Sequence, residues 1–336
     1  DPFNTIDFDY ELNEAISEKS KILGTDAKLL QDKNGDIVHR SLAEKLITLL
    51  LAKLVNFVPE GGIWMNTQLP EWNDANNALV GKGLSVVTLS YLRRYVLFCR
   101  QLFNQDSSDS LEISQEVTKL LHDIFGVLKQ FQDQLVGSFT DEQRRSVMDA
   151  LGIAGSNYRC QVYEEGLSGE FDSLDKETLL SLLDLTLKYI DHTLRANRRQ
   201  DDLFHTYNTL HLGENTASIR HLQEMLEGQV SVLSSGFLTA NDSLRLLHSL
   251  RNSVLYREDQ NTYILYPDKT LPDFLSKNTL TPDQLENLQL PGLLDEKGDK
   301  TLLIRDLKGI VHFSGDIHNI KDVNAALDLL LNQPDL

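Results

Sequence analysis

Residues 84–103 carry apolar side chains on more than one face of the helix they would form, and so do residues 41–58. A helix that is apolar all round has to be covered on every side, so both segments are expected to be buried helices. Residues 112–136, 174–195 and 240–254 show a single apolar stripe with polar residues opposite, which is typical of half-exposed outer helices. An inner apolar set that alternates with an outer amphipathic set predicts a double-layered helical toroid.

Four helix starts carry the pattern of a capping box, in which a Ser or Thr precedes an acid or amide by three residues. Such pairs satisfy backbone N–H groups that have no partner inside the helix. The last pair encloses Pro282 at the first helical position, where a missing N–H costs nothing. The four pairs are Ser41 and Glu44, Thr140 and Gln143, Thr239 and Asp242, and Thr281 and Gln284.

Signals for β-strands are few and lie late in the chain. Residues 263–266 are one such signal, and residues 302–304 and 310–313 flank a Lys-Gly turn that predicts a short hairpin. We therefore expect a mainly α fold with a few short β-strands near the C-terminus. The prediction is one helical domain over residues 1–336, with an irregular segment at 256–319.

Charge and composition exclude several classes of function. The 336 residues include 32 Lys and Arg against 50 Asp and Glu, a formal net charge of −18, and no Lys/Arg-rich run. Binding to nucleic acid or to an anionic membrane is therefore not expected, because phosphate groups would have no cationic partner. Two cysteines are too few for a disulfide scaffold. A cytoplasmic location is expected, and a periplasmic one stays open because the chain begins at Asp1 without a Met.

The chemistry of the chain is concentrated in residues 71–77, which hold an indole, two acids and three amides. Sugars require an apolar face to rest on, amides and carboxylates to hold hydroxyl groups, and an acid to protonate a leaving oxygen. Both tryptophans of the chain, Trp64 and Trp72, fall in this neighbourhood. The alternative is an ordinary loop, because Asn and Asp are common in turns. The six polar and aromatic residues are Glu71, Trp72, Asn73, Asp74, Asn76 and Asn77.

These residues also carry a family resemblance. The Trp72-Asn73-Asp74 triplet is followed by Asn77 and by Val-Gly-Lys-Gly-x-Ser-Val at residues 80–86, and a second block runs from Gln229 to Gly236. Together they resemble the catalytic domain of inverting disaccharide phosphorylases of the cellobiose phosphorylase type. The resemblance implies an (α/α)6 barrel, of which this chain would be a fragment. It also implies that Asp74 is the general acid, that Trp72 lines the sugar pocket, and that inorganic phosphate is a co-substrate.

The chain departs from that family in two respects. The family's donor-site Arg and Asp have no match in the residues before the triplet. Its phosphate-binding segment contains a Glu-Asn-Gly-Gly run, whereas residues 309–319 here read Gly-Ile-Val-His-Phe-Ser-Gly-Asp-Ile-His-Asn. Hydrolysis therefore stays open beside phosphorolysis.

A second polar cluster lies at residues 158–169, where aromatic residues, an Arg and paired acids lead into a glycine turn. Arg159 and Tyr163 are candidates for sugar binding, and Glu164 or Glu165 could act as a base or hold sugar hydroxyls. The alternative is an amphipathic edge with solvated acids. Gln229 is a further binding candidate because it begins the second matched block. Histidines at 204–211 lack the spacing of a zinc site, and structural roles are expected for them.

The sequence thus predicts a carbohydrate-active protein, an inverting glycoside phosphorylase or hydrolase acting on a di- or oligosaccharide. The alternative is a non-catalytic helical module that binds glycan or protein. No metal or resident cofactor is expected. The expected partners are an oligosaccharide, the remaining parts of a longer chain, and further copies of the same chain. The catalytic candidates are Asp74, Glu165 and Glu164, and the binding candidates are Trp72, Trp64, Glu71, Asn73, Asn76, Asn77, Arg159, Tyr163 and Gln229.

Overall fold

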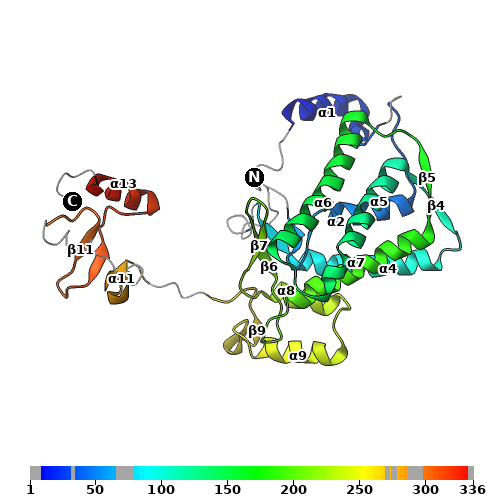
Figure 1. The fold of residues 1–336 in the computed structure, drawn as a ribbon. Coiled ribbons are helices and arrows are strands. Elements are labelled where there is room, and N and C mark those ends of the chain that lie inside the picture. Colours follow the sequence, from blue (N-terminus) through cyan, green and yellow to red (C-terminus); the bar gives the residue numbers. More distant parts are fainter. Residues whose placement is uncertain are drawn as a thin grey trace. The chain divides into compact units, whose positions relative to one another are not determined.

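The computed structural model describes residues 9–31, 35–65, 79, 81–268, 273, 278–286 and 298–331. The chain forms two compact units, Asp1–Pro267 and Asp268–Leu336. Figure 1 shows the helices and strands of each unit.

Helices make up most of the first unit, and their buried faces meet in one hydrophobic core. The 20-residue helix α4 contributes Leu89, Val96 and Cys99 to that core, and it lies against α7. The helices are α1 (Tyr10–Leu23), α2 (Leu42–Leu54), α4 (Val86–Gln105), α5 (Gln115–Gln130), α6 (Asp141–Cys160), α7 (Lys176–Ala196), α8 (Leu226–Ser234) and α9 (Ala240–Arg251). Short helical turns lie at Gly24–Lys28, Gln132–Val136, Gln161–Glu165 and Glu258–Gln260.

A five-stranded antiparallel sheet runs through the same unit, and it overturns the predicted helical toroid. Its order is β1-β2-β3-β6-β7, so strands far apart in the sequence become neighbours. Two further pairs, β4 with β5 and β8 with β9, form separate two-stranded sheets. The strands are β1 (Phe57–Val58), β2 (Gly62–Trp64), β3 (Gly83–Ser85), β4 (Ser110–Ser114), β5 (Phe171–Asp175), β6 (Tyr207–Leu212), β7 (Ala217–His221), β8 (Tyr256–Arg257) and β9 (Thr262–Tyr263).

The expectation that strands are few and lie only near the C-terminus was wrong, because the five-stranded sheet is built from segments too short to show a period of two. Strands β1, β2 and β3 have two or three residues each, and two of them begin at Gly62 and Gly83. Strand β6 contains Asn208 and His211, which are typical of loops, yet Asn208 is fully buried by pairing with β3 and β7. Strand formation here depends on long-range pairing rather than on local pattern.

The helix starts agree better with the sequence. Thr140 forms a complete capping box with Gln143. Thr281 and Gln284 form the same pair of bonds: the Thr281 hydroxyl oxygen accepts the Gln284 N–H, and the Gln284 side-chain oxygen accepts the Thr281 N–H. Ser41 caps α2 through the Glu44 N–H, but the Glu44 carboxylate bonds to Ser114 instead of reaching back. Thr239 likewise caps α9, because its hydroxyl oxygen accepts the Asp242 N–H.

The second unit contains a three-stranded sheet of order β10-β12-β11 with a core of its own. The hairpin predicted around residues 302–313 is the antiparallel pair of β11 and β12. That the two units belong to one larger catalytic domain stays a prediction. The elements are β10 (Thr279–Leu280), α11 (Pro282–Glu286), β11 (Leu303–Arg305), β12 (Val311–Phe313) and α13 (Ile320–Leu331).

Within the described residues, none of the helices combines the length and the apolar character that crossing a bilayer requires.

Candidate functional site: a pocket between helix α6 and Trp64

The indole of Trp64 is fixed at the edge of the sheet. Trp64 pairs with Leu84 across β2 and β3, and its Nε1 donates a hydrogen bond to the Gly81 carbonyl at 3.1 Å. On the same face of the sheet, Leu84 and Leu210 pack against Met148 of α6. The ring therefore has a defined orientation between the sheet and α6.

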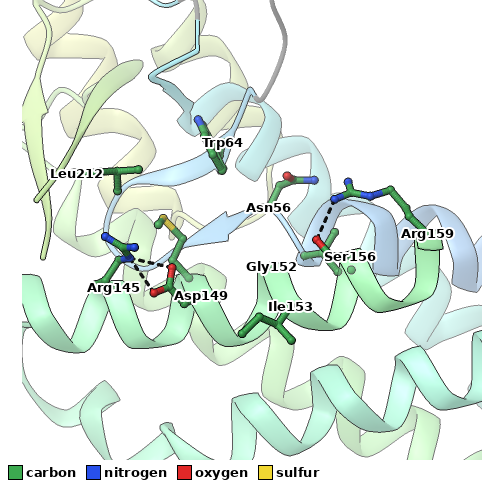
Figure 2. Close-up of a pocket in the computed structure, with 12 residues that line it drawn as sticks. Asn56, Trp64, Arg145, Asp149, Gly152, Ile153, Ser156, Arg159 and Leu212 are labelled. Atoms are coloured by element: carbon green, nitrogen blue, oxygen red, sulfur yellow. Dashed lines mark hydrogen bonds and ion pairs between the residues drawn. The ribbon is translucent and has the colours of Figure 1, made fainter. Parts of the chain in front are cut away.

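A pocket of about 540 Å³ opens between this indole and the side of α6 that carries Arg145 and Asp149 (Figure 2). Its wall combines one aromatic ring, two guanidinium groups, a carboxylate, an amide and a hydroxyl with aliphatic side chains. That mixture of an apolar surface with a few polar groups is typical of small-molecule sites. The lining residues are Val55, Asn56, Trp64, Arg145, Met148, Asp149, Gly152, Ile153, Gly155, Ser156, Arg159 and Leu212.

The polar groups form a row along α6. Arg145, Asp149, Gly152, Ser156 and Arg159 are spaced by four, three, four and three residues, which places them on one side of a helix. A Cβ added at Gly152 would meet nothing within 4 Å, so this glycine leaves the floor of the pocket open. The row is long enough to face an extended ligand rather than a single small group.

Close packing of α6 against the end of α2 depends on a second glycine. A Cβ added at Gly155 would lie 2.8 Å from the Val55 Cβ, which is closer than side chains approach one another. Gly155 is therefore required where the helix touches Val55, whereas Gly152, one turn earlier, has free space. The two glycines thus have different roles on one helix.

Hydrogen bonds fix the positions of the charged side chains that line the pocket. Arg145 Nε donates to both Asp149 oxygens at 2.8 Å, and its Nη1 donates to the Gly213 carbonyl at 2.8 Å. Arg159 Nη2 lies 3.3 Å from Ser156 Oγ, and Arg159 is exposed. Because both Asp149 oxygens accept hydrogen bonds from Arg145, the position of the carboxylate in the pocket is fixed.

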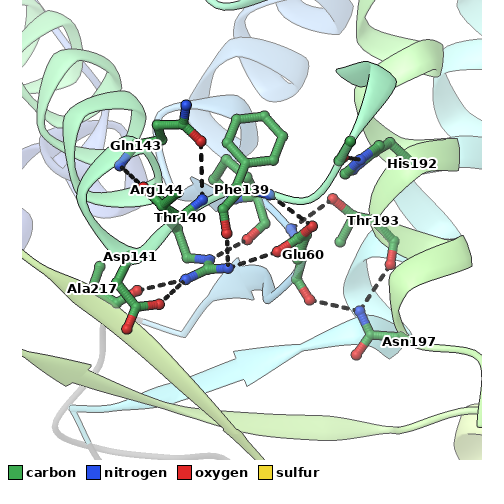
Figure 3. Close-up of polar contacts among 12 residues, drawn as sticks. Glu60, Phe139, Thr140, Asp141, Gln143, Arg144, His192, Thr193, Asn197 and Ala217 are labelled. Atoms are coloured by element: carbon green, nitrogen blue, oxygen red, sulfur yellow. Dashed lines mark hydrogen bonds and ion pairs between the residues drawn. The ribbon is translucent and has the colours of Figure 1, made fainter. Parts of the chain in front are cut away.

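A buried network behind the pocket holds α6 to the turn between β1 and β2 (Figure 3). Arg144 donates to the carbonyls of Pro59, Phe139 and Ala217, and its Nη2 lies 2.6 Å from Glu60 Oε2. Glu60 has φ of 62°, a conformation that costs energy in a residue other than glycine.

Helix α7 supports the same turn from the other side. Thr193 Oγ1 accepts the Glu60 N–H at 3.0 Å, and Asn197 Nδ2 donates to the Glu60 carbonyl at 2.8 Å. Both side chains are buried. The wall that carries Trp64 is therefore anchored to two helices.

Two of the residues predicted from the sequence, Trp64 and Arg159, meet in this pocket. Tyr163, Glu164 and Glu165 lie in the π-helical turn that ends α6; all three are exposed, and none lines the pocket. The residues Glu71, Trp72, Asn73, Asp74, Asn76 and Asn77 lie outside the described part of the chain.

Gln229 is fully buried at the first turns of α8. Its Oε1 accepts the Phe204 N–H and its Nε2 donates to the Phe204 carbonyl, both at 2.8 Å. A third bond runs from Nε2 to the Met225 carbonyl at 2.9 Å. In this structure the amide therefore joins α8 to the chain before β6.

Sequence reasoning missed Arg145, Asp149, Asn56 and Ser156. The signal was the spacing along α6, where polar residues and a glycine share one face. It was hidden because polar residues on one side of a helix usually face solvent. Among the described residues, no group of three or more His, Cys, Asp or Glu side chains is arranged to hold a metal ion.

His205, one of the histidines for which a structural role was predicted, forms an unusual pair with His221. The rings of His205 and His221 stack with centroids 4.0 Å apart and planes 7° from parallel. His221 Nδ1 lies 2.7 Å from Asn208 Oδ1. Burial, and to a smaller extent the neighbouring imidazole of His221, lower the pKa of His205 to about 4.

Comparison with known proteins gives a match for the C-terminal part of the chain. No curated protein matches the chain. Residues 271–336 match the family model described as GH149 phosphorylase insertion domain 2, and this segment nearly coincides with the second compact unit. The match points to a glycoside phosphorylase family and to a carbohydrate-active protein, without indicating the cellobiose phosphorylase type in particular.

Proposed function

We propose that this chain is part of a glycoside phosphorylase that cleaves an oligosaccharide with inversion. The observation that carries the proposal is the match of residues 271–336 to a phosphorylase insertion domain. It is independent of the Trp72-Asn73-Asp74 triplet, which lies in the other unit. Two separate parts of one chain thus favour the same class of enzyme.

The proposed chemistry assigns the general acid to Asp74. Asp74 gives its proton to the glycosidic oxygen as the bond from that oxygen to the anomeric carbon breaks. An oxygen of inorganic phosphate forms the new bond to the anomeric carbon from the opposite face, which inverts the configuration. Trp72 and Trp64 supply apolar surfaces for the sugar rings, and Glu71, Asn73, Asn76 and Asn77 hold hydroxyl groups.

The pocket beside Trp64 supports binding of a sugar. Its indole offers an apolar face, the Asn56 amide offers a donor and an acceptor, and Arg145 and Arg159 on α6 offer donors. Glu164 and Glu165 remain candidates for the second carboxylate. The buried Gln229 would act by holding the Phe204 backbone in place.

A non-catalytic glycan-binding module is the second candidate. One observation favours it: the carboxylate in the pocket, Asp149, is engaged by Arg145 through both oxygens, so this pocket binds without supplying a free acid. This candidate predicts that oligosaccharide raises the melting temperature while no bond is cleaved.

The direct test is Asp74→Asn in the full-length protein. The assay follows release of sugar 1-phosphate from β-linked oligosaccharides in the presence of inorganic phosphate. The expected result is loss of at least about a hundredfold in kcat, in keeping with removal of a general acid. Glu71→Gln is the control in the same segment, and it is expected to raise KM more than it lowers kcat.

Two outcomes decide between the candidates. Full activity of Asp74→Asn would show that Asp74 is not the general acid. Turnover that persists without phosphate would identify a hydrolase, and stabilisation by oligosaccharide without any turnover would identify the binding module.

A further inference from the structure

The two guanidinium groups that line the pocket beside Trp64 differ in their partners. Arg145 is engaged by Asp149, whereas Arg159 Nη2 lies 3.3 Å from the neutral hydroxyl of Ser156. Among the described residues, none of the carboxylates forms an ion pair with Arg159. Asp149 supplies the only carboxylate among the described residues that line the pocket. The positive charge of Arg159 is therefore not balanced within the pocket, although the chain as a whole carries a formal charge of −18.

A cation at this position also has a structural use. Helix α6 ends at Cys160, so Arg159 lies in its last turn, where a positive charge compensates the partial negative charge of the helix C-terminus. That use requires a charge, and a lysine would serve it equally well. It does not account for a guanidinium that lines a pocket together with an indole.

The groups around Arg159 suit a ligand that combines a ring with a charge. Figure 2 shows Trp64 and Asn56 facing the side of α6 that carries Gly152 and Arg159. The Asn56 Nδ2 donates to the Ala52 carbonyl at 3.0 Å, which leaves the amide oxygen to accept a hydrogen bond from a hydroxyl group. Gly152 and Arg159 are about 10 Å apart along the helix axis, at about 1.5 Å per residue. A sugar ring and an anionic substituent thus have room side by side.

We propose that this pocket binds a sugar that carries a phosphate or a carboxylate group, with the ring on the Trp64 indole and the anion on the Arg159 guanidinium. A guanidinium binds either anion through two parallel N–H···O bonds. This inference rests on the proposed function in taking the ligand to be a sugar, and it goes beyond that function in assigning the ligand a negative charge. The proposed reaction itself supplies one such ligand, a sugar 1-phosphate.

Isothermal calorimetry on the full chain tests the charge of the ligand. The probes are glucose, glucose 1-phosphate, glucose 6-phosphate, glucuronate and inorganic phosphate. The anionic sugars are expected to bind about tenfold more tightly than glucose, because each adds a charge-assisted hydrogen bond. Inorganic phosphate has no ring to place on the indole and is expected to bind about tenfold more weakly than the sugar phosphates. Comparison of the sugar phosphates with glucuronate identifies the preferred anion. Anionic sugars that bind no more tightly than glucose would overturn the proposal.

Substitutions of Arg159 separate the pocket from the helix end. Arg159→Ala is expected to lower the affinity for the anionic sugars about tenfold, and the affinity for glucose much less. Arg159→Lys keeps the positive charge in the last turn of α6 but loses the planar guanidinium, so only part of the affinity is expected to remain. Thermal unfolding identifies a variant that fails to fold, and if Arg159→Ala does, Arg159→Lys decides in its place.

Arg94→Ala is the matched control. Arg94 is exposed on α4, lies over the Tyr91 ring at 5.8 Å from its centroid, and does not line the pocket. The variant removes the same charge from the chain and is expected to leave every affinity unchanged. Equal losses in Arg94→Ala and Arg159→Ala would show that affinity follows the net charge of the chain, and the proposal would then be wrong.

Fluorescence tests the position of the sugar ring. Titration with glucose 6-phosphate, which the proposed reaction does not produce, is expected to change the indole emission of the chain. Trp64→Phe still contains Trp72, and it is expected to lose that change. A change of the same size in Trp64→Phe would show that the ligand binds away from this pocket.

None of these measurements requires turnover. If the full-length protein cleaves no oligosaccharide, the proposed function fails, while calorimetry still decides whether the pocket binds anionic sugars. If the protein shows phosphorolysis but binds anionic sugars no more tightly than glucose, the present inference fails and the proposed function stands.

Discussion

Arg144 Nη2 lies 2.6 Å from Glu60 Oε2, and both side chains are largely buried. The pair joins α6 to the turn between β1 and β2, directly behind the wall that carries Trp64. Arg144 also donates to three backbone carbonyls, so one buried guanidinium joins α6 to several segments of the chain.

Arg144→Ala is expected to lower the free energy of unfolding by about 3–5 kcal/mol, since it leaves the Glu60 carboxylate buried without its partner. Urea denaturation measures this. Arg245→Ala is the control: Arg245 pairs with Asp242 at the surface with 59% of its side chain exposed, and a change below about 1 kcal/mol is expected. Equal effects of the two variants would contradict the role given to the buried pair.

The stacked histidines predict a loss of stability at low pH. His205 is neutral in the folded chain down to a pKa of about 4, whereas an unfolded histidine takes up a proton near its ordinary value of about 6.5. The unfolded chain therefore binds more protons between these values, and the free energy of unfolding falls as pH drops from about 6.5 to about 4. Above that window the contribution is fully present.

His205→Asn is expected to reduce the fall in the free energy of unfolding between pH about 6.5 and about 4 by about 1–3 kcal/mol. The reason is that the variant no longer has a group that binds a proton more readily in the unfolded chain than in the folded one. Urea denaturation at a series of pH values gives the slope. His248→Asn is the comparison, because His248 is exposed on α9. A slope that survives in His205→Asn and disappears in His248→Asn would assign the effect to the wrong histidine.

The sequence predicted the helices of the first unit because their periodicity and caps are local. Thr140 and Gln143 lie three residues apart and close a capping box that needs nothing beyond α6. Strand β3 is different: Gly83, Leu84 and Ser85 have no strand pattern of their own and become a strand through β2 on one side and β6 on the other. Such pairing is not visible without the fold.

In the candidate site, too, the sequence indicated features that depend on local chemistry and missed those that depend on the fold. Trp64 was found by its chemistry, and Arg159 by its place in a polar cluster, yet their meeting depends on the packing of α6 on the sheet. Asp149 was missed because an acid on a helix face is usually solvated, and only the bond to Arg145 and the open floor at Gly152 give it a place in a pocket. Gln229 was selected because it begins the second block that resembles the phosphorylase family, and the sequence did not indicate that its side chain is buried.

Two glycines one turn apart on α6 are expected to respond oppositely to the same substitution. Gly155→Ala puts a Cβ 2.8 Å from the Val55 Cβ and is expected to destabilise the protein by about 1–3 kcal/mol. Gly152→Ala meets nothing within 4 Å and is expected to stabilise α6 by up to about 1 kcal/mol through helix propensity. Thermal unfolding measures both, and a common sign for the two shifts would refute this account of the helix.

Substitutions in the pocket test whether it binds sugar. Trp64→Leu removes the aromatic face and Arg159→Ala removes an exposed donor, so each is expected to weaken oligosaccharide binding, by about tenfold for the indole and less for the guanidinium. Gly152→Ala places a methyl group on the open floor of the pocket and is expected to weaken binding without loss of stability, so it separates an effect on binding from an effect on folding.

Isothermal calorimetry with oligosaccharides of increasing length gives the affinities. Arg100→Ala is the control, since Arg100 pairs with Asp184 on α7 and does not line the pocket. If Arg100→Ala weakens binding as much as Trp64→Leu, the site lies elsewhere.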